Sequence, residues 1–182
     1  MMRAKFFFCM IFMPWMYLFA NPCALDGIKS ERDIQKSYQF IKKKALSCQI
    51  HPEEYLDFTK QAFLAEQYSL AIWSSKKGME HTGKKPEIHD ELNYFLGISY
   101  LENGRFEDAI KTLRQIVFQE SSKKKYSELI QKAHLALIEA YFKRSQKQDE
   151  NVNYLIRLYK NRYADSGYLF TLRSWNANAS IR

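Results

Sequence analysis

Glycine, proline and cysteine are scarce in this chain of 182 residues, which contains 6 Gly, 4 Pro and 3 Cys. So little glycine and proline argues against collagen-like sequence, disordered linkers and loop-rich all-β folds. The chain also has no Gly-rich loop that could cradle a phosphate group. A hydrophobic share of 46% excludes disorder over most of the chain. The length predicts one domain, large enough to form a core without a metal or a disulfide.

Residue groups that perform catalysis are missing as well. No HExxH motif occurs, and no histidine has a neighbour at metal-ligand spacing. The histidines are His51, His81, His89 and His134. Two Ser-x-x-Lys sequences, at 74–77 and 121–124, lack the companion motifs of serine-lysine enzymes, and no CxxC pair indicates a redox site. The sequence therefore predicts a non-enzymatic protein without metal or cofactor, in which His134 is a packing residue.

The first 20 residues have the features of a secretory signal peptide. Arg3 and Lys5 precede an uncharged apolar run at 6–20 that is short for a membrane span. We expect cleavage after Ala20. An uncleaved N-terminal anchor and lipid attachment at Cys23 remain open alternatives, and so does a disulfide between Cys23 and Cys48. The sequence predicts an exported protein that is periplasmic or associated with the cell envelope.

The net charge of +8 falls to +6 once the basic residues of the predicted signal are removed. For an exported protein, such a charge suits anionic lipid, polysaccharide or an acidic protein surface, and we expect no nucleic-acid partner. The two lysine triplets, at 42–44 and 123–125, are interpreted as solvated helix faces. Peripheral membrane association is a further expectation from this charge.

Hydrophobic periodicity predicts helices throughout and no strand. A first helix is expected from Ser30 to about Gln49, with Ile34, Tyr38, Ile41 and Ala45 on one face. A second begins at Pro52, where acidic residues follow proline. Further breaks between helices are expected near Gln67 and at 83–86, 103–104, 119–122 and 145–150. The predicted fold is all-α.

The segment 91–117 carries the best-defined motif. Its characteristic residues are Leu96, Gly97, Tyr100, Ala109 and Leu113. They match the pattern L-G-x-x-Y followed by A-x-x-x-F, with Leu113 in the place of the phenylalanine, so the segment resembles a tetratricopeptide repeat. Gly97 and Ala109 are expected to let two antiparallel helices approach closely. Gly104 is expected to end the first helix in the left-handed conformation.

Two weaker copies flank this segment. A shift of 38 residues aligns Tyr55, Phe58, Thr59, Ala62, Tyr68 and Ala71 with positions of the central copy, and His134, Leu137, Ile138 and Tyr141 begin a third copy. Its second helix is expected at about 152–163. The resemblance to the tetratricopeptide family therefore covers about three repeats in 52–163. The resemblance implies a solenoid of antiparallel helix pairs. We expect a linker and a capping helix at 21–51 and a C-terminal cap or tail at 164–182. Residues 158–166 are similar to repeat ends in exported bacterial proteins of the BamD and Tol-Pal coordinator type.

The family resemblance implies that the first helix of each pair lines a concave groove. The implied groove residues are Leu56, Lys60, Phe63, Tyr94, Ile98, Leu101, Leu135, Glu139 and Phe142, with Glu53, Glu91 and Lys132 among them at the helix starts. Tyr94 is the preferred anchor, and core packing is the alternative for Leu56, Phe63 and Leu101. Leu56-Asp57 and Tyr94-Phe95 stand where chaperone-binding members of the family carry a lysine and an asparagine that hold a terminal carboxylate.

These features predict an exported scaffold that binds a segment of an envelope protein, either an amphipathic helix or an extended peptide. The alternative function is the binding of an anionic envelope lipid or polymer through a basic helical surface. One further alternative stays open, in which the chain's own helix at 30–49 occupies the groove.

Overall fold

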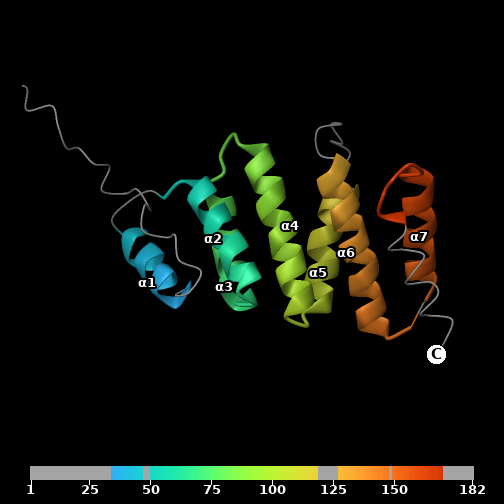
Figure 1. The fold of residues 1–182 in the computed structure, drawn as a ribbon, viewed down its shortest axis with the longest axis horizontal. Coiled ribbons are helices and arrows are strands. Elements are labelled where there is room, and N and C mark those ends of the chain that lie inside the picture. Colours follow the sequence, from blue (N-terminus) through green and yellow to red (C-terminus); the bar gives the residue numbers. More distant parts are fainter. Residues whose placement is uncertain (1–33, 47–49, 119–126, 148, 170–182) are drawn as a thin grey trace, which may run out of the picture.

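In the computed structural model, the described residues are 34–46, 50–118, 127–147 and 149–169, and within these ranges the chain forms helices and no strand (Figure 1). The helices are α1 (Ile34–Lys44), α2 (Pro52–Leu64), α3 (Tyr68–Glu80), α4 (Pro86–Glu102), α5 (Phe106–Phe118), α6 (Ser127–Ser145) and α7 (Glu150–Arg162). The prediction of an all-α fold is confirmed. No helix of these ranges is both long and apolar enough to cross a membrane.

From α2 onward, each helix packs against the next to form a row (Figure 1). The short connections at 65–67, 81–85 and 103–105 make consecutive helices from α2 to α5 antiparallel. In addition, α4 contacts both α2 and α6, whereas the pairs α3–α5 and α5–α7 make no comparable contact. The helices α2, α4 and α6 therefore lie together along one side of the row. We call the solvent-facing side of these three helices the α2–α4–α6 face.

Local capping explains where the helices begin. Pro52 is the first residue of α2, and the Glu54 carboxylate accepts a hydrogen bond from the His51 backbone N–H at 3.0 Å. The helix α7 begins at Glu150, two residues before the predicted start, because Asp149 Oδ1 accepts a hydrogen bond from the Val152 N–H at 3.0 Å. The expected breaks near 67 and at 83–86, 103–104 and 145–150 are observed, and the one at 119–122 lies outside the described residues.

The first helix is shorter than predicted. It ends at Lys44, so Ala45 lies in an exposed turn and does not extend the apolar face. Ile34 and Ile41 are buried, and the Tyr38 ring packs edge-on against Trp73 of α3, with 4.9 Å between ring centroids. The expected start at Ser30 lies outside the described residues. The same is true of the predicted signal peptide or anchor, of all three cysteines and of the tail at 170–182.

Burial recurs along the chain at a nearly constant spacing. Most buried positions of α2 and α3 recur 38 residues later in α4 and α5, and most of those of α4 recur 41 residues later in α6. Between α3 and α5, the recurring pairs are Ala71 and Ala109, Ile72 and Ile110, Ser74 and Thr112, and Ser75 and Leu113. The side chains that fill the row thus occupy equivalent places in successive helix pairs.

Close helix contact at Gly97 is confirmed. A Cβ atom added to Gly97 would lie 2.6 Å from Leu113 Cδ2, so only glycine fits this contact between α4 and α5. Gly104 has a φ of +74°, which confirms its left-handed conformation after α4. Glu66 and Gln146 take the same conformation in the turns after α2 and α6, with φ values of 57° and 54°. The sequence contains no glycine signal at these two turns.

Candidate partner-binding face

Seven of the nine predicted groove residues are partly exposed on α2, α4 and α6. They are Lys60, Phe63, Tyr94, Ile98, Leu135, Glu139 and Phe142. The other two, Leu56 and Leu101, have only 6% and 3% of their surface exposed. Leu56 and Leu101 are therefore core residues, as the packing alternative had it, and they are not available to a partner on the surface.

Aromatic rings join α2 to α4 on this face. The Phe63 ring meets the Phe95 ring edge-on with 5.9 Å between centroids, and Tyr94 meets Phe95 in the same way at 5.6 Å. The Lys60 ammonium lies 5.9 Å from the centroid of Phe95. Phe95 was not among the predicted groove residues. In the sequence, Phe95 directly follows the predicted groove residue Tyr94, and this position was the only indication that Phe95 lies on the same face.

Ion pairs connect the charged residues of the same face. The Lys60 ammonium lies 2.7 Å from the Glu91 carboxylate and ties α2 to α4, and the Lys143 ammonium lies 2.8 Å from Glu139 and 3.8 Å from Glu102. Two further pairs lie near the helix starts, Lys132 with Glu128 at 2.8 Å and Lys85 with Glu53. The positive and negative charges are thus matched locally, so the face offers little net charge to a ligand.

Tyr94 lies beside the beginning of α6. Burial raises the pKa of its hydroxyl, and the nearby Lys132 ammonium partly opposes that shift. The hydrogen bond from Lys132 lowers the pKa of the Glu128 carboxyl, which also accepts a hydrogen bond from the Tyr168 hydroxyl at 3.4 Å. The residues after α7 therefore reach back to the start of α6. Within this turn, Ser166 Oγ donates to Gln131 Oε1 at 2.6 Å.

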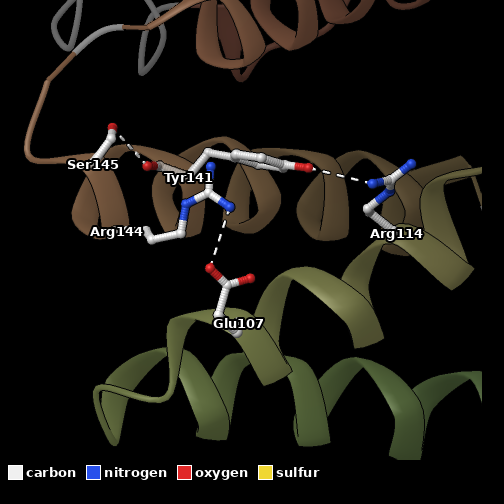
Figure 2. Close-up of polar contacts among 5 residues, drawn as sticks. All are labelled: Glu107, Arg114, Tyr141, Arg144 and Ser145. Carbon is white, nitrogen blue, oxygen red and sulfur yellow. Dashed lines mark hydrogen bonds and ion pairs between the residues drawn. The ribbon is translucent and has the colours of Figure 1, made fainter.

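A separate polar cluster joins α5 to the end of α6 (Figure 2). The Arg144 guanidinium donates to the Glu107 carboxylate at 3.3 Å, and it lies 4.7 Å from the centroid of the Tyr141 ring. Arg114 donates to the Tyr141 hydroxyl at 3.5 Å. Tyr141 is only 8% exposed. These contacts hold one helix pair against the next, and they leave no open site at Tyr141.

His134 is fully buried, in agreement with the expectation of a packing residue. Its ring meets those of Tyr159 and Tyr163 edge-on, with centroid distances of 5.2 and 6.0 Å. Among the described residues, neither ring nitrogen makes a hydrogen bond of normal distance and angle. Burial lowers the pKa of His134 to about 4; the Arg162 charge adds to this shift, and the Leu155 backbone opposes it. Across the described ranges, no group of three or more His, Cys, Asp or Glu residues could hold a metal ion.

The helix α1 lies at one end of the row and does not cover the α2–α4–α6 face. Its packing contacts are with α2 and, through Tyr38, with Trp73 of α3. Figure 1 shows α1 beyond α2, on the side away from α4. The described part of the predicted helix therefore caps the row, and the alternative in which it fills the groove does not hold for residues 34–46.

Comparison with known proteins identifies no relative of this chain. No family model matches the chain, and no curated protein or solved structure is significantly similar to it.

Proposed function

We propose that the chain is an exported tetratricopeptide-type scaffold that binds a segment of another envelope protein on the α2–α4–α6 face and catalyses no reaction. The observation that carries the proposal is the recurrence of burial at shifts of 38 and 41 residues, together with the contacts among alternate helices α2, α4 and α6. Stacked helix pairs of a solenoid repeat their core positions in this way, and their closely spaced helices line the concave side.

The chemistry of the face favours an apolar partner segment. Its lysines and acids already pair with one another, so a charged peptide would have to compete with existing ion pairs. The half-buried Phe63, Tyr94 and Ile98 present apolar surface of the kind that anchors a bound helix or strand. We therefore expect the partner to contribute an amphipathic helix or an extended peptide with apolar side chains facing this surface.

Capture in the native cells tests this function. The full-length tagged protein is crosslinked in situ and its partners are identified by mass spectrometry, in parallel with the variant Ile98→Gln, Leu135→Gln. The matched control is Leu70→Gln, Leu158→Gln, which changes equally half-buried residues of α3 and α7. Both variants are first checked for native helix content and thermal unfolding.

We expect a protein that the wild type and the control capture and that the α2–α4–α6 variant loses. Equal capture by both folded variants would contradict the assignment of the binding face. Leu101 is left unchanged in both variants because it is buried. A charged residue in its place would unfold the protein and abolish binding for a reason unrelated to the face.

Export is a separate element of the proposal, motivated by the apolar run at 6–20 that follows Arg3 and Lys5. Protein purified from the native cells is expected to begin at Asn21, which intact-mass spectrometry measures directly. A mass that includes residues 1–20 would favour the anchor, and a mass increased by a lipid with Cys23 as the first residue would favour the lipoprotein.

A further inference from the structure

The helix α1 differs from the other described helices because it contains basic residues and no acidic ones. All four charged residues of this helix are lysines: Lys36, Lys42, Lys43 and Lys44. The chain contains no aspartate or glutamate from Ile34 until Glu53. Lys36, Phe40 and Lys43 follow one another at i, i+4 and i+7, so they form a single stripe. This stripe lies opposite the buried Ile34 and Ile41.

Two large apolar side chains lie within this basic surface. Phe40 is 40% exposed, and its ring centroid is 4.6 Å from the Lys44 ammonium. Leu46, in the turn after the helix, is 88% exposed, more than any other large hydrophobic residue in the described ranges. We call the set of Lys36, Phe40, Lys42, Lys43, Lys44 and Leu46 the basic face of α1.

The other side of α1 attaches this surface to the folded row. Ile41 has none of its surface exposed, and Ile34, Tyr38 and Trp73 belong to the same core cluster as Ile41. The basic face is therefore carried on a docked helix at the end of the row, and the α2–α4–α6 face lies on other helices (Figure 1).

We propose that the basic face of α1 binds an anionic lipid surface. Lysines near a membrane that contains anionic lipid each favour binding electrostatically, and exposed Phe and Leu gain by entering the boundary between headgroups and acyl chains. An anionic polysaccharide would match the lysines but gives Phe40 and Leu46 no apolar medium to enter, and an acidic protein would need a pocket shaped to fit them, whereas a lipid surface accepts them without one. This surface acts in addition to the scaffold function and uses different residues.

Vesicle binding of the full-length chain tests the proposal. The probes are vesicles of phosphatidylcholine alone and vesicles that also contain phosphatidylglycerol. The variant Lys42→Gln, Lys43→Gln removes charge from the basic face, and Lys111→Gln, Lys160→Gln removes the same charge from exposed positions of α5 and α7. The apolar variant is Phe40→Gln, Leu46→Gln, and its matched control is Leu64→Gln, Tyr154→Gln, at residues 73% and 52% exposed. All proteins share residues 1–33, so differences between them report only the substituted positions.

Removing Lys42 and Lys43 is expected to weaken binding to phosphatidylglycerol vesicles about 25-fold, because each lysine near such a surface contributes a factor of about five. The apolar variant is expected to weaken it about tenfold or more. Both controls, and the Ile98→Gln, Leu135→Gln variant, should bind like the wild type. Wild-type binding should also fall as salt rises from about 0.05 M to about 0.5 M.

Three results would overturn the proposal. Equal losses in the α1 lysine variant and its control would mean that net charge alone drives binding. Loss in the lysine variant with wild-type binding in the apolar variant would indicate recognition of anionic groups without a lipid surface. A wild type that dimerises in sedimentation, together with monomeric α1 variants and no vesicle binding by any of them, would assign the basic face to a second copy of the chain.

Discussion

At the scale of single residues, the stability of the folded protein is expected to depend on pH through His134. Its pKa is about 4 in the folded protein and about 6.5 in an unfolded chain. As the pH falls below 6.5, the unfolded chain takes up the proton first, so the folded state loses stability until the pH reaches about 4. The free energy of unfolding should therefore be about 2 kcal/mol lower at pH 5 than at pH 7.5 because of this residue.

The variant His134→Asn tests this, since Asn93 occupies the equivalent place in α4. Urea unfolding at the two pH values should show a pH-dependent loss smaller by about 2 kcal/mol than that of the wild type. The exposed His89→Asn variant should keep the wild-type loss. An unchanged pH dependence in His134→Asn would mean that His134 is protonated equally in both states.

The residues of the candidate face could be predicted only in part. The resemblance to tetratricopeptide repeats implied that Lys60, Tyr94 and Ile98 are groove residues, and these side chains are partly exposed. Spacing along the helix adds only which residues share one side. Spacing does not determine how closely the neighbouring helix approaches, and that approach buries Leu56 and Leu101. The pairing of Lys60 with Glu91 likewise depends on the distance between α2 and α4, which no local pattern contains.

At the scale of elements, the α4–α5 pair depends on the absence of a side chain at Gly97. The variant Gly97→Ala would place a methyl group 2.6 Å from Leu113 Cδ2, and Leu113 is fully buried, so it has little room to move. We expect destabilisation by about 1 to 3 kcal/mol, although alanine favours a helix more than glycine does.

Thermal and urea unfolding measure this effect, with Gly167→Ala as the control because no atom of the described residues lies within 4 Å of a Cβ added there. The control should change the free energy of unfolding by less than about 0.5 kcal/mol. A Gly97→Ala protein as stable as the wild type would show that Leu113 relaxes freely and that the glycine is not needed for helix contact.

Most element boundaries could be predicted because they are encoded locally. Proline at the first position of α2 and α4 and glycine after α4 are signals that act within a few residues. The end of α1 at Lys44 was missed because hydrophobic periodicity continued to Ala45 without a breaker. The left-handed conformation of Glu66 could not be predicted because glutamate does not favour it. The packing of α2 against α3 holds the residue in this conformation.

At the scale of the whole molecule, each helix depends mainly on its neighbours, as contacts between helices remote in the row are absent or weak among the described residues. The end helix α1 has the fewest contacts, and its docking relies on Ile34 and Ile41. A row built in this way is expected to open from its ends at a lower free energy than from its middle.

Hydrogen exchange measured helix by helix tests this expectation. In the wild type, the amides of α4 and α5 should exchange most slowly and those of α1 fastest. The variant Ile41→Ala removes a fully buried side chain, so α1 should lose protection while α5 and α6 keep theirs. Leu113→Ala, at an equally buried position between α4 and α5, should instead accelerate exchange in α3 to α6 together. If Ile41→Ala accelerated all helices equally, the molecule would unfold as one cooperative unit, and the basic face of α1 could not detach without loss of the whole row.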